Sequence, residues 1–204
     1  MAKQILAEKI QMMELFDENG IVTPVTVVRV RQNIVTEIKT SDRDGYEALQ
    51  IGFGSKKEKN ITKPLKGHLK KSGAFPKVIK EFKMPAGDLK IGDKIEAAVF
   101  NAGDEVEVRG RVKGRGFQGV VKRHGFKGGP RTHGQKHSER EPGSIGSVWP
   151  QRVLKGKRMA GRMGGNMITV KNLKIVKIDP EVGLLYIKGA LPGSRGTVIE
   201  IKSK

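Results

Sequence analysis

A glycine-rich motif is the first feature of this sequence that could do chemistry, because it could hold a nucleotide. The segment Gly114 to Gly119, "GRGFQG", matches G-x-G-x-x-G, and Val121 extends it to the protein kinase pattern. A dinucleotide site also needs a helix that opens at this turn, but the following "VVKRHGFKGGP" is β-branched, cationic and interrupted by glycine. A kinase needs HRD and DFG sequences, and neither occurs. We therefore expect no nucleotide fold and no small-molecule substrate.

Three histidines in the same region could bind a metal or act in acid–base catalysis. His124, His133 and His137 each lie among Lys and Arg, the chain has no Cys, and Gly134 disfavours a helical pair of ligands. Contact with phosphate or sugar is the simpler interpretation. A nucleic-acid-modifying enzyme that uses these histidines stays open as an alternative, and it predicts a large loss of turnover when one of them is replaced.

Serines and carboxylates give no better catalytic candidate. Ser144 and Ser147 lie in "PGSIGS", which is typical of a tight turn and does not form the G-x-S-x-G elbow of a nucleophile. Glu139 and Glu141 flank Arg140 in a cationic segment, which favours ionised carboxylates over the protonated acid that general acid catalysis needs. We predict no catalytic residue, no metal, no cofactor and no enzymatic activity.

The positive charge of the chain is concentrated in one internal segment. The 204 residues carry a net charge of +19, and residues 111–165 contain 14 Lys or Arg against two Glu, together with 13 of the 27 glycines. The apolar residues of this segment follow no period of 2 or 3.6, so it is predicted to be an extended arm. Because such a segment repels itself, the pattern predicts a polyanionic partner.

RNA is the polyanion that this composition favours. Glycines allow close approach of the backbone to phosphates, arginines bind phosphates in a bidentate way, and Phe117, Phe126 and Trp149 can stack on unpaired bases. No recognition helix or zinc finger for duplex DNA is visible. A nucleoid or membrane-surface protein that binds any polyanion is the second alternative, and it predicts no preference among RNAs.

The predicted RNA-binding side chains are nearly all cationic or aromatic. They are Arg111, Lys113, Arg115, Lys122, Arg123, His124, Lys127, Arg131, His133, Lys136, His137, Arg140, Trp149, Arg152, Lys155, Lys157, Arg158 and Arg162. Close backbone approach is expected at Gly114, Gly116, Gly119, Gly143, Gly146 and Gly161.

The segments on both sides of the arm are predicted to be strands. Alternating or β-branched patterns occur at residues 21–30, 33–40, 46–53, 94–100, 105–112, 167–179 and 184–191, with turn residues such as Asn19-Gly20 between them. One short helix is expected near residues 62–72, with Thr62 as N-cap and Pro64 in the first turn. The fold class is mainly β, a small and mostly antiparallel split barrel built by residues 1–110 and 166–204, with the irregular arm at 111–165.

Nothing in the sequence directs the chain to a membrane. No run of about 18 apolar residues occurs, the first residues lack the pattern of a signal peptide, and the absence of Cys fits a reducing compartment. We expect a cytoplasmic protein with no membrane partner.

Several ordered segments resemble one known family. "KGRGFQGVVKRHGFKGGPRTHG", "PGSIGSVWPQRVLKGKRMAGRMGG" and "LLYIKGALPGSRG" are closely similar to the bacterial form of the third large-subunit ribosomal protein, and "LFDENGIVTPVTVV" and "DGYEALQIGFG" extend the resemblance over nearly the whole chain. One departure is "AEKIQMMELF", which stands where the family has a more basic, glycine-rich stretch, so no RNA contact is carried over to it.

The resemblance implies a fold, a partner and a role. It implies a split β-barrel on the surface of the large ribosomal subunit, with an arm that threads into the ribosomal RNA toward the peptidyl-transferase region, and a part in early subunit assembly. Neighbouring large-subunit proteins are then further partners. Lys155, Lys157 and Arg158 would hold phosphates, and Gly143, Gly146 and Gly161 would supply the close backbone approach.

Overall fold

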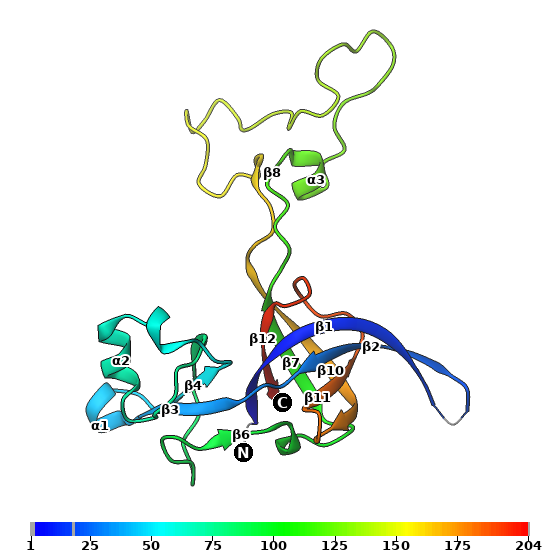
Figure 1. Ribbon diagram of the computed structural model, residues 1–204. Helices are drawn as coiled ribbons and strands as arrows, with labels where there is room; N and C mark the ends of the chain where they lie inside the picture. Colours follow the sequence, from blue (N-terminus) through cyan, green and yellow to red (C-terminus); the bar gives the residue numbers. More distant parts are fainter. Residues whose placement is uncertain (1–2, 18, 204) are drawn as a thin grey trace. The chain divides into compact units, whose positions relative to one another are not determined.

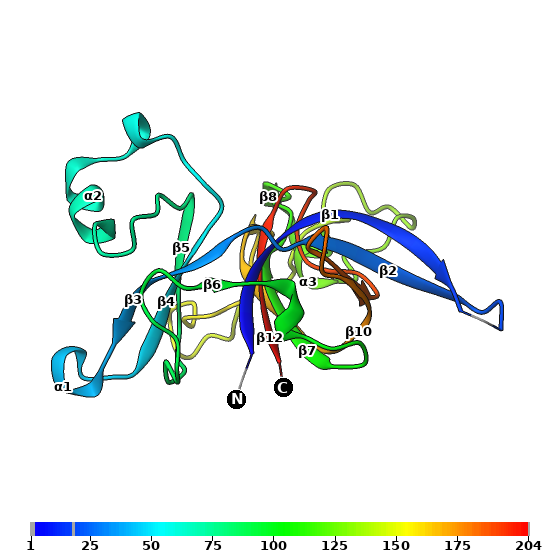
Figure 2. The ribbon, with the colours of Figure 1, turned by 60° about the horizontal axis from the view of Figure 1, so that its bottom comes forward.

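The protein consists of two compact units. The computed structural model describes residues 3–17 and 19–203 (Figures 1 and 2). We name the first unit, Met1–Arg111 with Met167–Lys204, the body, and the second, Val112–Asn166, the arm. The body is therefore built from both halves of the sequence, and the arm is the segment between them.

A closed barrel of six antiparallel strands forms the larger part of the body (Figure 1). Its strands follow one another around the barrel in the order β1 (Gln4–Phe16), β12 (Val198–Ser203), β7 (Glu105–Arg111), β10 (Met167–Asp179), β11 (Leu184–Lys188) and β2 (Val22–Arg29). Three of these strands precede the arm in sequence and three follow it, so neither half closes the barrel alone. This confirms the predicted mainly β fold with a small antiparallel barrel.

Alternation of side chains explains why these segments form barrel strands. In β7, Val106, Val108 and Gly110 are buried while their neighbours face outward, and Ile199 and Ile201 of β12 are fully buried in the same way. Gly110 pairs with Ile199, and a Cβ at Gly110 would lie 2.9 Å from the Ile199 side chain. The barrel interior therefore requires glycine at this point, since any larger residue would force the strands apart.

A four-stranded antiparallel sheet adjoins the barrel within the body. Its order is β5 (Val78–Phe82), β4 (Ala48–Phe53), β3 (Asn33–Lys39) and β6 (Lys94–Ile95). All six residues of β4 are buried, and Leu49 and Ile51 belong to the same hydrophobic cluster as the barrel residues Ile5 and Val108. The buried Asn33 side chain accepts a hydrogen bond from the Leu6 N–H at 2.9 Å and donates one to the Leu6 carbonyl at 3.0 Å. Sheet and barrel therefore share one core.

The helices of the body are short. They are α1 (Ser41–Asp44) and α2 (Lys63–Leu69), with 3₁₀ turns at η1 (Glu58–Asn60) and η2 (Ala97–Val99). The predicted helix near residues 62–72 corresponds to α2, although the Thr62 side chain makes no capping bond and the helix ends earlier, at Leu69. The predicted strand at residues 94–100 is wrong beyond Ile95, because the alanines that follow favour the 3₁₀ turn η2 over a strand.

Candidate nucleic-acid interface

The base of the arm is a pair of chain passes joined by backbone hydrogen bonds. The Val112 N–H donates to the Asn166 carbonyl at 3.0 Å, and the Arg115 N–H donates to the Met163 carbonyl at 2.9 Å. Two-residue strands continue the pairing, β8 (Phe117–Gln118) with β9 (Gly161–Arg162). This antiparallel stem leaves residues 119–160 as one excursion that begins and ends at the same place.

A short helix, α3 (Val120–His124), follows the glycine-rich motif. The β-branched and cationic sequence predicts no helix here, and the structure shows that this prediction is wrong. The Val120 side chain is only 3% exposed, and Gly125 ends the helix at φ 72°. Helix α3 has five residues, little more than one turn, and the preceding β8 pairs antiparallel with β9. The structure describes the whole arm, and the arm lacks the parallel strands and long helix of a dinucleotide-binding fold.

Two of the predicted RNA-binding side chains make internal contacts that close the arm. Arg123 Nη1 donates to the Met159 carbonyl at 2.6 Å, and His124 Nε2 lies 3.0 Å from the same oxygen. A Cβ on Gly161 would lie 2.7 Å from Arg123 Nη1, so the close approach at Gly161 serves this guanidinium. Arg123 and His124 therefore tie helix α3 to the returning chain.

The excursion at residues 119–160, which we name the outer loop, is also held by backbone contacts at glycine. The Gly129 N–H donates to the Glu139 carbonyl at 3.0 Å, and Gly128 has φ 75° with no room for a Cβ beside that same carbonyl. The Glu139 carboxylate forms an ion pair with Arg131. Of the two acidic groups in the arm, one is thus already neutralised within the protein, which leaves the remaining cations to set the potential of the surface.

The other predicted side chains are displayed outward. Sixteen of the eighteen are exposed, and only Arg123 and His124 are partly buried. Trp149 is 77% exposed and Phe117 is 76% exposed, which is unusual for aromatic rings in a folded protein. Arg111 is the last residue of β7, so it belongs to the body, whereas the other seventeen lie in the arm.

The predicted interface did not include four apolar residues that flank Trp149 in the sequence. Ile145, Val148, Val153 and Leu154 are each more than 40% exposed. These residues follow no period of 2 or 3.6, and the segment has no core. This pattern predicts that they have no protein partner within the arm. They give the outer loop an apolar surface beside its cations, as a stacking or close-packing contact with RNA requires.

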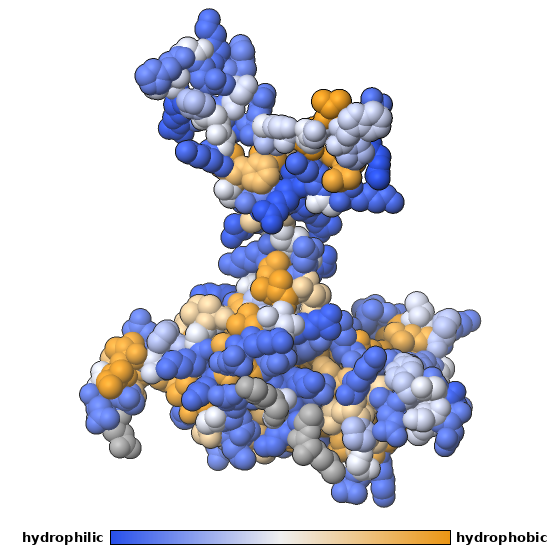
Figure 3. Space-filling model, turned by 180° about the vertical axis from the view of Figure 1, so that it is seen from behind, coloured by the Kyte–Doolittle hydropathy of each residue, from blue (hydrophilic) through white to orange (hydrophobic). Residues whose placement is uncertain are grey.

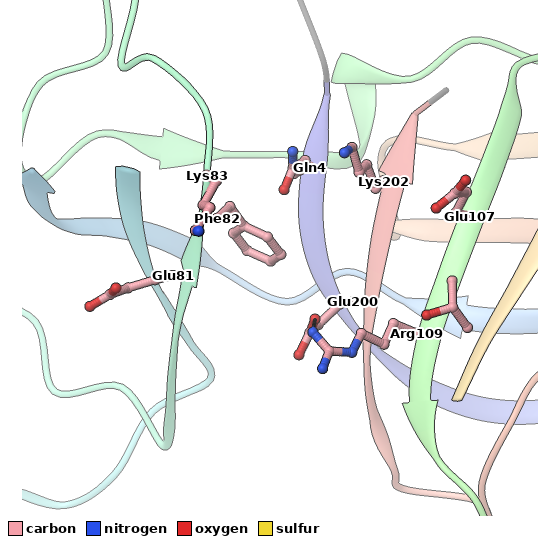
Figure 4. A pocket seen from close by; sticks show the side chains of 9 residues that line it. Gln4, Glu81, Phe82, Lys83, Glu107, Arg109, Glu200 and Lys202 are labelled. Carbon is pink, nitrogen blue, oxygen red and sulfur yellow. Dashed lines mark ion pairs between the residues drawn. The ribbon is translucent and has the colours of Figure 1, made fainter. Parts of the chain in front are cut away.

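A cavity in the body is the competing candidate for a ligand site (Figure 4). It encloses about 340 Å³ and is lined by Gln4, Glu81, Phe82, Lys83, Glu107, Arg109, Thr169, Glu200 and Lys202. The lining contains three carboxylates and three cations, and Glu200 pairs with Arg109 at 3.7 Å and with Lys80 at 3.4 Å. A lining in which charges neutralise one another does not resemble the apolar wall of a small-molecule site.

One of the clusters with shifted pKa values in the body lies on the four-stranded sheet. Lys39 Nζ donates to Tyr46 Oη at 2.7 Å and pairs with Glu81 at 2.9 Å, and these contacts raise the pKa of Lys39. The hydrogen bond from Lys39 in turn lowers the pKa of Glu81. Both shifts favour the charged forms at neutral pH, which is the behaviour of a structural ion pair and not of an acid–base catalyst.

Residues 3–17 and 19–203 contain neither a cluster of metal-binding side chains nor a helix that could cross a membrane. No group of three or more His, Asp or Glu residues is placed to hold a metal ion in these ranges. No helix there is long and apolar enough to cross a membrane. The geometry thus offers one extended surface of cations, glycines and exposed rings, the arm.

Comparison with known proteins decides the family. The family model described as "Ribosomal protein L3" matches residues 72–184, a range that contains the whole arm. The chain is 50% identical over 204 residues to "Large ribosomal subunit protein uL3" of Exiguobacterium sibiricum, which covers 100% of this chain and 98% of that protein. Proteins of the same name from Alkaliphilus metalliredigens and Streptococcus pyogenes serotype M5 are each 48% identical, and 97% of each is covered. The chain belongs to the ribosomal protein L3 family.

Membership of the ribosomal protein L3 family confirms the resemblance that the sequence motifs indicated. Proteins of this family are structural and non-enzymatic, so the prediction that this protein is not an enzyme is confirmed by kinship. The alternative of a nucleic-acid-modifying enzyme is thereby removed. Of the three histidines considered, His124 has a contact within the protein, its Nε2 lying 3.0 Å from the Met159 carbonyl oxygen.

Proposed function

We propose that this protein is a structural constituent of the large ribosomal subunit in the cytoplasm, and that it binds large-subunit ribosomal RNA through its arm. One observation carries the proposal: the arm has 13 Lys or Arg against two Glu, and Val120 is its single buried hydrophobic side chain. A unit of this composition cannot fold around an apolar core, but it can fold against a polyanion. Relatives that match over the full chain are named as large-subunit proteins, which supports the same partner.

Phosphate neutralisation is the main physical contribution of the arm. Each Lys or Arg that meets a phosphate releases condensed counterions, and this gain in entropy drives binding. Lys155, Lys157 and Arg158 are all exposed in the outer loop, where they can contact neighbouring phosphates. Gly143 and Gly146 are also exposed and have no side chain to keep the backbone away from RNA. By fixing RNA segments together in this way, the arm would support early assembly and would reach toward the peptidyl-transferase region.

Stacking adds a contact that does not depend on charge. Trp149 and Phe117 are exposed rings with neighbouring cations in sequence, and unpaired bases of folded RNA stack on such rings. Irregular RNA offers such bases, whereas a regular duplex does not. This difference supports ribosomal RNA over a general polyanion such as a membrane surface.

The test is a replacement of the arm. Residues 115–163 are replaced by a short Gly-Ser linker, which the structure allows because the Arg115 N–H lies 2.9 Å from the Met163 carbonyl. Tagged intact and trimmed chains are followed through a sucrose gradient of lysate after a moderate salt wash. We expect the intact chain to sediment with large subunits and the trimmed chain to stay at the top.

Two controls make this result decisive. The trimmed chain must show a cooperative melting transition, which establishes that the body is folded. If the intact chain also stays at the top of the gradient, the ribosomal role is contradicted. If both chains sediment with large subunits, the role stands but the arm is not the anchor.

A further inference from the structure

The β1–β2 hairpin extends beyond the barrel as a two-stranded ribbon (Figures 1 and 2). β1 pairs with β12 only over Gln4–Glu8, and β2 pairs with β11 only over Val25–Arg29. Beyond these points the two strands pair only with each other, up to Phe16 opposite Val22. An isolated two-stranded ribbon is marginally stable in water, so it gains from a partner that covers it.

The end of the ribbon is well formed. The Asp17 carboxylate accepts hydrogen bonds from the Ile21 N–H at 2.8 Å and from the Asn19 N–H at 3.2 Å, and the Gly20 N–H donates to the Asp17 carbonyl at 2.9 Å. These bonds join the ends of the two strands and so favour the pairing of β1 with β2.

One face of the ribbon is apolar and exposed. Directly opposed residues of an antiparallel pair share a face, so Met12, Phe16, Val22 and Pro24 lie on one side, with Glu14 among them. Phe16 is 70% exposed, Met12 is 50% exposed and Val22 is 47% exposed. Figure 3 shows apolar side chains gathered at this end of the body, on its left. We name these five residues the ribbon face.

The charge of this region is opposite to that of the rest of the chain. From Ile10 to Val28 the sequence contains no Lys or Arg, which is the longest interval without a cation among the 204 residues, and it contains Glu14, Asp17 and Glu18. RNA binding needs cations, and carboxylates beside phosphates would repel them. The ribbon face is therefore unsuited to RNA.

We propose that the ribbon face is the docking surface for a positively charged protein of the same large subunit. The inference rests on the proposed ribosomal function. Exposed Met and Phe supply an apolar centre, and Glu14 and Asp17 supply negative charge that complements Lys and Arg on the partner. The acidic and apolar ribbon of the body thus differs in chemistry from the basic arm, which is proposed to bind RNA.

Site-specific photo-crosslinking tests this proposal in the assembled particle. A benzophenone amino acid replaces Phe16 in the tagged full-length chain, large subunits are isolated by sedimentation and irradiated, and crosslinked peptides are identified by mass spectrometry. The same probe at Val182, which is 64% exposed in the β10–β11 turn, serves as the matched control position. We expect the Phe16 probe to crosslink a protein of the large subunit at a peptide that contains Lys or Arg.

A charge reversal distinguishes docking from chance proximity. Glu14→Lys places a cation on the ribbon face without touching the Asp17 turn, and Glu47→Lys makes the same change at an exposed position of the body outside the ribbon. A charge contact between Glu14 and the partner is worth about 1 kcal/mol, which corresponds to about fivefold in affinity. We therefore expect Glu14→Lys to lower the crosslink yield by about fivefold. Glu47→Lys should leave the yield unchanged.

Each outcome decides between the proposals. If the probe-bearing chain is absent from large subunits, the ribosomal function fails, and this inference fails with it. If the chain is present but the Phe16 probe crosslinks only RNA, crosslinks nothing, or reaches a peptide without Lys or Arg, the ribosomal function stands and the docking surface is wrong. An unchanged yield in Glu14→Lys also overturns it.

Discussion

The body and the arm of this protein use opposite means to acquire structure. In the body, Ile5, Leu49, Val108 and Ile201 are fully buried in one cluster that joins both halves of the chain. In the arm, Val120 is the single buried hydrophobic residue, and the chain is held by backbone hydrogen bonds and by Arg123 and His124 on one carbonyl. The body is thus held by a hydrophobic core, whereas the arm is held mainly by polar contacts, and we propose that RNA completes its structure.

Charge follows the same division. In the body, carboxylates lie within ion-pair distance of cations, as in Lys39–Glu81 and Lys80–Glu200. Among the described residues of the arm, one ion pair is formed, Arg131–Glu139. Some cations of the body therefore form ion pairs within the body. Most cations of the arm have no acidic partner within the arm. An excess of cations without acidic partners therefore distinguishes the arm, the proposed RNA-binding unit, from the body.

The largest effect should come from removing one core side chain. Ile201→Ala leaves a cavity beside Val108 in the barrel and should destabilise the protein by about 2–5 kcal/mol. Ile145→Ala in the arm removes a side chain that is 44% exposed, so it should leave stability unchanged. Chemical unfolding of both variants measures this. An equal loss of unfolding free energy in the two variants would show that the arm contributes to the core and would contradict this difference between body and arm.

The next effect concerns the arm cations. Replacing Lys155, Lys157 and Arg158 by Gln removes three exposed charges, so the magnitude of the slope of log affinity for ribosomal RNA against log salt should fall by about 2–3, with affinity reduced on the order of 100-fold. Lys56, Lys57 and Lys59, exposed in the body, provide the matched triple substitution, which should have the smaller effect. A filter-binding titration at several salt concentrations measures both. An equal loss of RNA affinity in the two triple variants would contradict a binding role concentrated in the arm.

A smaller effect is expected for the exposed ring. Trp149→Ala should weaken RNA binding by about 1–3 kcal/mol through lost stacking and leave the melting temperature unchanged. Trp149 is the single tryptophan of the chain, so its fluorescence reports on the arm alone. In the native protein, addition of ribosomal RNA should quench this emission. An emission that does not respond to RNA at saturation would argue against stacking.

The smallest effect is expected for the ion pair on the four-stranded sheet. Because Lys39 lowers the pKa of Glu81 below its ordinary value of 4.5, the pair stabilises the folded state above that pH, and this stability is lost as the pH falls through the lowered pKa. Glu81→Gln should lower the melting temperature slightly at pH 7, and the difference from the native protein should vanish in acid. Melting curves from pH 7 to pH 3 measure this, and a constant difference would rule out the pairing as its source.

Most of the fold could be predicted from patterns of side chains. Strand β10 coincides with the expected residues 167–179, and β3 and β7 lie within one residue of their expected ends. β1 was not expected from any pattern, because its outer half is exposed on both faces and so carries apolar residues on both. Such a strand shows no alternation, although it is one of the longest in the protein.

The site was predictable in composition but not in detail. Charge and glycine content located the arm, and sixteen of the eighteen predicted side chains are exposed as an interface requires. Helix α3 was not predictable from propensity, since two valines begin it, and burial of Val120 overrides their β preference. No pattern in the sequence indicates that Arg123 and His124 meet the Met159 carbonyl, because that contact joins residues 35 or more positions apart.

The salt dependence of binding to large-subunit ribosomal RNA tests the central claim most directly. The affinity of the full-length chain is compared with that of the variant in which residues 115–163 are a Gly-Ser linker, over a series of salt concentrations. Since each phosphate contact contributes about −0.7 to −0.9 to the slope, we predict a steep dependence for the intact chain and a much shallower one for the variant. The same slope for both chains, with the variant still folded, would contradict the assignment of RNA binding to the arm.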